Sequence, residues 1–140
     1  MIPATAVSLD LEPHPEGGWF RRIYTSSVPV ETAGGERPTA TCIHYLLTPG
    51  EESLWHVVTS DELWLWHGPG TLELSLGGNA SGPSGNPEVV RLGGDHAAGE
   101  VPARLVPAGV WQAARLGGTD EALVSCVVSP GFDFADWRLA

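Results

Sequence analysis

The chain has 140 residues, 42% of them apolar, which suits a single domain over residues 1–140 with one hydrophobic core. Seventeen acidic residues against seven basic ones give a formal net charge of −10, and such a field repels phosphate backbones, which argues against a nucleic-acid partner. No apolar run approaches the roughly 18 residues of a membrane-spanning helix, and the first residues do not resemble a signal peptide. We therefore expect a cytoplasmic protein without a membrane partner.

The predicted elements are a short helix followed by about nine strands, because 18 glycines and 12 prolines separate short runs of alternating apolar and polar residues. In chain order, the helix is expected over residues 4–11 and the strands over 19–25, 39–47, 54–58, 62–67, 71–76, 88–92, 103–106, 110–116 and 122–128. Residues 26–38 and 77–87 are expected to be loops, and 130–140 an aromatic tail packed on the body. This pattern favours an all-β sandwich or barrel of antiparallel strands.

The two cysteines, Cys42 and Cys126, each lie inside a strand-like run and form no CxxC pair. Buried free thiols in a reducing compartment are the expected state. In the strand over 39–47, alternation places Cys42 and His44 on one face and Ile43 and Tyr45 on the other.

Residues 53–68 combine two histidines, two acidic residues and three of the six tryptophans. Small polar residues in the middle predict a tight turn, so the segment is expected to form a β-hairpin. Alternation would then bring the His56 imidazole together with the Glu62 carboxyl, beside Trp64 and Trp66, in an aromatic cavity. A carboxyl group in such a place has to be paired, bound to a metal or protonated.

Two motifs in the chain resemble those of the cupin superfamily. Residues 50–62 are similar to the first cupin metal motif, G-x5-H-x-H-x3-E-x6-G, with Val58 where the second histidine belongs. Residues 107–112 are similar to the second motif, P-x-G-x-x-H, with Gln112 in the place of the histidine.

A narrower resemblance extends over nearly the whole chain, through the segments PHPEGGWFRRIY (13–24), IHYLL (43–47), SLWHVVTSDELWLWHG (53–68), VPAGVWQAA (106–114) and SPGFDFADW (129–137). These segments resemble the cupin 5 family, a domain of unknown function. The resemblance implies an RmlC-like double-stranded β-helix, or jelly-roll barrel, with a ligand cavity at its mouth, and a homodimer. It does not supply an activity.

The departures from the cupin motifs leave the cofactor open. The resemblance implies that His56, Glu62 and Gln112 stand where a cupin holds its metal, but two imidazoles of the usual ligand set are absent, which should weaken binding of Fe, Ni, Cu or Zn. We expect either a weakly bound divalent ion at these three residues or no metal, unless His44 or His67 completes the set.

The His56–Glu62 pair is the predicted catalytic centre, in which the imidazole moves a proton and the carboxyl tunes its pKa. The alternative is a structural pair that only fixes strand register. The predicted substrate-binding residues are those able to bond or stack on a polar ligand: His44, Trp64, Trp66, Trp111, Gln112, Glu16 and Arg21. Core packing, backbone contacts or a subunit contact would explain the same residues without a ligand.

Three functions are compatible with this pocket. The first is an enzyme of isomerase or epimerase type that does acid/base chemistry on a small polar or sugar-like metabolite. The second is a non-catalytic small-molecule binding or sensor module. The third is a metal-dependent oxygenase or lyase, which requires the weakened ligand set to hold an ion.

Overall fold

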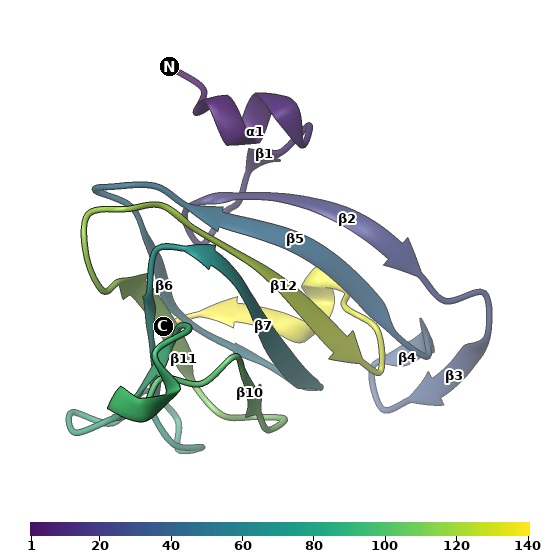
Figure 1. Cartoon of the computed structure of the whole chain (residues 1–140). Helices are drawn as coiled ribbons and strands as arrows, with labels where there is room; N and C mark the ends of the chain where they lie inside the picture. The colour runs from purple at the N-terminus through teal and green to yellow at the C-terminus, as the bar shows by residue number, and fades with distance from the viewer.

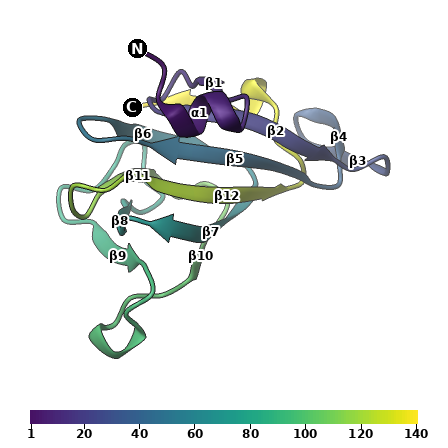
Figure 2. The same cartoon turned by 45° about the horizontal axis from the view of Figure 1, so that its top comes forward.

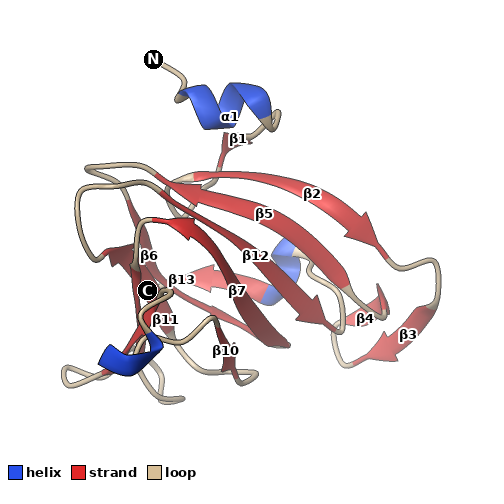
Figure 3. Cartoon of the chain, in the orientation of Figure 1, coloured by secondary structure: helices blue, strands red, loops and turns tan.

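The strands predicted from alternation form two facing antiparallel sheets in the computed structural model, which describes residues 1–140 (Figures 1 and 3). The six-stranded sheet has the order β1 (Glu12–Pro13), β2 (Trp19–Thr25), β5 (Thr41–Leu47), β12 (Ala122–Ser129), β7 (Asp61–Pro69) and β10 (Ala103–Val106). The five-stranded sheet has the order β13 (Trp137–Leu139), β6 (Glu52–Val58), β11 (Gln112–Leu116), β8 (Leu72–Leu76) and β9 (Glu88–Leu92).

The remaining elements are small. β3 (Pro29–Thr32) and β4 (Gly35–Pro38) form a separate hairpin that projects from one end of the molecule in Figure 1. The helical elements are α1 (Ala4–Ser8) and the single 3-10 turns η1 (His96–Ala98) and η2 (Phe134–Asp136). No helix is long and apolar enough to cross a membrane.

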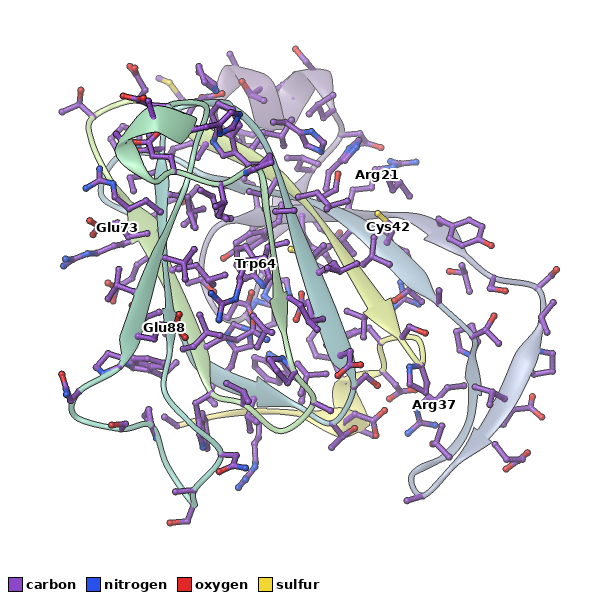
Figure 4. The ribbon with its side chains drawn as sticks, turned by 60° about the horizontal axis from the view of Figure 1, so that its bottom comes forward. Arg21, Arg37, Cys42, Trp64, Glu73 and Glu88 are labelled. Atoms are coloured by element: carbon purple, nitrogen blue, oxygen red, sulfur yellow. The ribbon has the colours of Figure 1, made fainter.

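The hydrophobic core fills the space between the sheets. A cluster of 12 buried residues draws from both layers and includes Tyr45, Trp64, Leu74 and Val124. Figure 4 shows Trp64 inside the sandwich, with Arg21 and Glu73 at its outside. The predicted all-β jelly-roll fold with a short N-terminal helix is confirmed, although the two sheets are not closed into one continuous barrel.

The N-terminal helix is shorter than predicted, ending at Ser8, and packs on the outer side of the six-stranded sheet. Figure 2 shows it there, over a sheet in which β5, β12 and β7 lie side by side. Ala6 of the helix is fully buried in a small second cluster with Leu11 and Leu46.

The predicted hairpin over residues 53–68 is wrong, because its two strands belong to different sheets. β6 pairs with β11 and β13, whereas β7 pairs with β12 and β10. Thr59 and Ser60 therefore carry the chain from one layer to the other, so that inward-facing residues of β6 and β7 meet across the sandwich.

A β-bulge in β6 breaks the predicted alternation. Ser53 pairs with Ala114 and His56 with Gln112, so Leu54 and Trp55 of β6 lie opposite the single residue Ala113 of β11. Ser53 and His56 are both buried, while Leu54 is 45% exposed. Strict alternation would place Leu54 and His56 on one face, and the bulge separates them because it adds one residue to the strand.

Two segments predicted without strands contain them. Residues 26–38 hold the β3–β4 hairpin, and the C-terminal tail forms η2 and then β13, in which Trp137 pairs with Val58 of β6. The bidentate Arg37–Asp136 ion pair, with Nε–Oδ2 at 2.8 Å and Nη2–Oδ1 at 3.0 Å, joins the hairpin to this tail. The tail is packed on the body, as predicted.

Truncation of the core should cost much more than truncation of the outer faces. Leu74 is fully buried, so Leu74→Ala is expected to lower the free energy of unfolding by about 2–5 kcal/mol through lost burial and a residual cavity. The matched change Leu54→Ala, at an exposed position, is expected to cost less than about 1 kcal/mol. Urea denaturation followed by tryptophan fluorescence measures both, and equal losses would contradict this core.

Candidate active site

A pocket between the two sheets gathers most of the buried ionisable side chains. Its walls come from β2, β5, β7 and β12, from β6 of the facing sheet, from the turn before β2 and from the C-terminal tail. The aromatic lining consists of Phe20, Phe132, Phe134 and Trp137. The cavity volume is about 40 Å³, which is room for a few water molecules at about 10–15 Å³ each. Only a small ligand, or the reacting end of a larger one, fits without movement of the walls.

The turn before β2 places Glu16 in this pocket. Gly17 and Gly18 have φ values of +108° and +75°, a region that strongly favours glycine. A Cβ on Gly17 would lie 2.0 Å from the carbonyl oxygen of Glu52. The close approach lets the Leu54 N–H, which the bulge leaves free, donate to the Glu16 carbonyl at 2.8 Å. The glycine turn and the bulge of β6 thus fit against each other.

His56 lies at the centre of the pocket and is 2% exposed. Its Nδ1 lies 2.7 Å from the Leu54 carbonyl oxygen, and because a carbonyl only accepts, Nδ1 carries the hydrogen. Nε2 lies 3.2 Å from Oε2 of Glu16. The imidazole therefore has a fixed N–H donor at Nδ1, and its second nitrogen, Nε2, faces the Glu16 carboxyl group.

The surroundings of Glu16 and His56 favour their neutral forms. Burial raises the pKa of Glu16 to about 7, against the lowering effect of a hydrogen bond that Trp137 Nε1 donates to Oε2 at 3.2 Å. Burial also lowers the pKa of His56, against the attraction of Glu62. Near neutral pH a protonated Glu16 beside a neutral His56 is thus well populated, and one proton can pass between them.

Glu62 enters the same pocket from the facing sheet. Burial, helped by the charge of Glu16, raises its pKa to about 7, although His56 and a hydrogen bond from Gln112 oppose the shift. Gln112 Nε2 donates to Glu62 Oε1 at 3.0 Å, and Trp64 Nε1 donates to Gln112 Oε1 at 2.7 Å. Because an indole N–H only donates, Trp64 fixes the orientation of the Gln112 amide and so of Glu62.

His14 completes the polar floor of the pocket. Its Nδ1 accepts a hydrogen bond from the backbone N–H of Glu16 at 3.1 Å, and its ring packs edge-on against Phe20 with centroids 4.5 Å apart. Burial, and secondarily the charge of His56, lowers the pKa of His14 to about 4. A neutral His14 therefore presents Nε2–H, and no hydrogen bond joins that group to another residue.

The predicted meeting of His56 with Glu62 is present in the structure, with Gln112 beside Glu62. Glu16, which was predicted only as a ligand-binding residue, contacts the imidazole, whereas Glu62 does not bond it directly. Trp64 lies behind Gln112 and does not line the pocket. The sequence signal for Glu16 was the glycine pair that follows it.

Besides Trp64 and Gln112, which lie behind the lining residues, four more predicted ligand-binding residues lie outside the pocket. His44 is on the outer face of the six-stranded sheet, near His67, because the inward positions of β5 are Thr41, Ile43 and Tyr45. Arg21 also points outward and pairs with Asp10.

The two tryptophans among these four have structural partners. Trp66 Nε1 donates to the Gly70 carbonyl at 2.7 Å, and Trp111 Nε1 donates to the Ala80 carbonyl at 3.0 Å. Neither lines the pocket.

Arg22, which was not predicted, does line the pocket. Strand parity decides between the two neighbouring arginines, since Arg22 pairs with inward-facing Ile43 and Arg21 with outward-facing His44. The sequence alone could not distinguish Arg22 from Arg21, because the choice depends on how β2 pairs with β5.

The residues predicted as metal ligands do not fit a metal site. No group of three or more His, Cys, Asp or Glu side chains is arranged to hold a metal ion. Gln112 Oε1, the only donor atom of the amide suited to a cation, accepts from Trp64. His56 directs Nδ1 to the Leu54 carbonyl and Nε2 to Glu16. Gln112 Oε1 and His56 Nδ1 are thus turned toward protein partners, which leaves Nε2 as the one nitrogen of His56 with a lone pair.

Comparison with known proteins places the chain in a family. The family model Cupin_5, described as "Cupin superfamily (DUF985)", matches residues 4–140. The chain belongs to this cupin family. YML079W, an uncharacterized protein of Saccharomyces cerevisiae (strain ATCC 204508 / S288c), is 34% identical to this chain over a 140-residue alignment. The alignment covers 88% of this chain and 67% of that protein.

Solved cupin structures are similar over nearly the whole chain. A hypothetical protein from Leishmania major has a TM-score of 0.88 at 30% identity, covering 96% of this chain and 84% of the other. Protein SO0799 from Shewanella oneidensis has a TM-score of 0.87 at 35% identity, covering 100% and 85%. A variant of the oxalate decarboxylase of B. subtilis, at a TM-score of 0.63 and 16% identity over 94% of this chain and 31% of the other, shares the fold alone.

The raised pKa values of the two pocket carboxyls can be measured directly. In protein labelled with ¹³C at the glutamate carboxyl carbons, Glu16 and Glu62 are expected to titrate near pH 7, well above the ordinary glutamate pKa of 4.5. Glu16→Gln should lower the pKa of Glu62, because it removes a like charge. Titration of every glutamate near pH 4.5 would contradict the burial of this pair.

Proposed function

We propose that this cupin is a proton-transfer enzyme of isomerase type that acts on a small polar metabolite. The observation that carries the proposal is the pocket in which His56, in contact with Glu16, faces Glu62 across the sandwich. Groups that titrate near the working pH are the ones suited to general acid/base catalysis. Perturbed carboxyls in an enclosed pocket are more typical of functional sites than of stabilising ion pairs.

The proposed chemistry is proton movement next to a carbonyl group. His56 Nε2 takes a proton from the carbon beside the carbonyl, the electron pair moves to the carbonyl oxygen, and the Glu62 carboxyl protonates that oxygen. When the deprotonated carbon carries a hydroxyl, the product is an enediol. That hydroxyl gives its proton to Glu62 as the new carbonyl forms, and the imidazolium protonates the former carbonyl carbon. The reacting form is the one with Glu16 ionised, which is also populated near pH 7. The ionised Glu16 leaves the Nε2 lone pair free, orients the imidazole and balances its charge while the proton is held. Atoms and charge balance, and both groups regain their starting states.

The surroundings support this assignment. Four aromatic side chains restrict water around the reacting groups, which strengthens electrostatic interactions in the site. The fixed Nδ1–H of His56 keeps the lone pair on Nε2 at neutral pH. The small cavity admits a compact polar group, such as the carbonyl end of a hydroxy acid or a short sugar.

The alternative of a metal-dependent oxygenase or lyase has weaker support. Oxalate decarboxylase and oxalate oxidase share the fold with this chain at 16% and 14% identity, but the predicted ligand atoms here are turned toward protein partners. A binding or sensor module without turnover uses the same pocket, and it is distinguished by experiment.

Hydrogen exchange with solvent tests proton abstraction without knowledge of the product. The protein is incubated in D₂O with short hydroxy acids, oxo acids and sugars, and ¹H NMR follows loss of the carbon-bound proton. We expect exchange on at least one compound, and His56→Ala should slow it by about 10²–10⁴-fold. Glu62→Gln should also slow it, because the carbonyl oxygen loses its proton donor.

The matched control for this experiment is His44→Ala, which removes an imidazole from the outer face of the sheet and should leave exchange unchanged. Thermal unfolding of each variant separates loss of chemistry from loss of fold. If some of the compounds bind in the pocket but none of the set exchanges a carbon-bound proton, the result would favour the binding module and overturn the enzyme proposal.

Self-association and cytoplasmic location remain predictions. A homodimer would bury apolar side chains that now lie exposed on the six-stranded sheet, among them Ile23, Tyr24, Leu63 and Leu105. Such an exposed apolar face is compatible with a subunit contact.

A further inference from the structure

Arginine is the only basic residue type that the chain uses besides histidine, and six of its seven arginines have a partner that accounts for them. Five form ion pairs with carboxylates, and the sixth lies over an indole ring with its Cζ 5.3 Å from the centroid. The pairs are Arg21 with Asp10, Arg37 with Asp136, Arg91 and Arg115 with Glu73, and Arg104 with Glu88, while Arg138 lies over Trp111.

Arg22 has neither kind of partner. None of the 17 acidic side chains forms an ion pair with it, in a chain with a formal net charge of −10. Its one hydrogen bond runs from Nη2 to the backbone carbonyl of Phe132 at 2.9 Å. A guanidinium has five N–H donors in a fixed fork, so this bond anchors the side chain and leaves most donors available.

The position of Arg22 relates it to the pocket. It lies on β2 next to Ile43 of β5, both residues line the pocket, and its side chain is exposed on the solvent side. Phe132, which holds it, belongs to the C-terminal tail and also lines the pocket. Arg22 is thus the only permanently cationic group among the lining residues, and as an exposed residue it lies on the solvent side of the pocket.

The buried carboxyls do not take up this cation. Glu62 accepts a hydrogen bond from Gln112, and Glu16 contacts His56 and Trp137. A guanidinium fork matches the two oxygens of a carboxylate or a phosphate group, and such charge-assisted pairs are among the stronger polar contacts of proteins.

We propose that Arg22 binds an oxyanion, the carboxylate or phosphate group of a small substrate, and so holds the reacting part of that substrate against His56 and Glu62. This inference rests on the proposed function for the role of the pocket, and it adds the class of substrate. The small cavity restricts the part beyond the oxyanion to a few atoms, as in a short hydroxy or oxo acid or its phosphate ester.

Binding of matched probes tests the role of Arg22 without any turnover. Glycolate, inorganic phosphate and the neutral analogue glycolamide are titrated into ¹⁵N-labelled protein, and the indole N–H signal of Trp137 reports binding. Glycolate or phosphate should bind about tenfold or more tightly than glycolamide, because only they can pair with the guanidinium. The tighter of the two anions indicates which oxyanion the substrate carries.

Two variants separate this role from general effects of charge. Arg22→Gln should abolish the preference for the anion, while Arg21→Gln, the neighbouring and outward-facing arginine, should leave it intact. Thermal unfolding checks that both variants fold. Equal binding of glycolate and glycolamide, unchanged anion binding in Arg22→Gln, or no binding of either anion would each overturn the inference.

Failure of the oxyanion site and failure of the proposed proton transfer give different results. Anion binding that depends on Arg22, together with no solvent exchange of any bound compound, would overturn proton transfer and retain the oxyanion site. Solvent exchange that is lost in His56→Ala but is equally fast in Arg22→Gln would retain proton transfer and overturn the oxyanion site.

Discussion

The site depends on one backbone contact, the docking of the turn before β2 on the bulge of β6. The bulge frees the N–H of Leu54, which donates to the Glu16 carbonyl, and it directs the Leu54 carbonyl to Nδ1 of His56. One residue thus fixes both members of the His56–Glu16 contact. Gly17 and Gly18 are needed because only residues with positive φ and no side chain permit so close an approach.

The two-layered architecture supplies the rest of the site. Because the chain passes from one sheet to the other between β6 and β7, Glu62 reaches His56 across the sandwich instead of along one sheet. A carboxyl in this buried interior is tolerated since Gln112 bonds it and Trp64 orients Gln112. Polar groups held in this way can keep pKa values near neutrality, which is the property that the proposed chemistry uses.

Most of the fold was predictable from the sequence, because strand alternation and glycine- or proline-rich turns are local signals. The strands over 19–25, 88–92 and 103–106 have their predicted bounds. The assignment of strands to sheets was not predictable from these signals, and β6 and β7 were wrongly joined in a hairpin. Two short polar residues suit a tight turn and a crossing between layers equally well.

The candidate site was predicted in part for the same reason. His56, Glu62 and Gln112 lie in motifs with fixed spacing, so the resemblance located them. The choice between Arg21 and Arg22, and the exclusion of His44, depend on which face of β2 and β5 is inward, and that follows from pairing between distant segments. The aromatic tail was seen as packed on the body, but its place in the wall of the pocket needed the structure.

The state of the His56 ring is the most direct test of this account. Long-range ¹H–¹⁵N correlation NMR of the histidine side chains distinguishes the two neutral tautomers and the imidazolium, and His56→Gln identifies the signal. We predict a neutral His56 with its hydrogen on Nδ1 at pH 7, since burial lowers its pKa and the Leu54 carbonyl holds that hydrogen. An imidazolium at pH 7, or a ring with its hydrogen on Nε2, would contradict it.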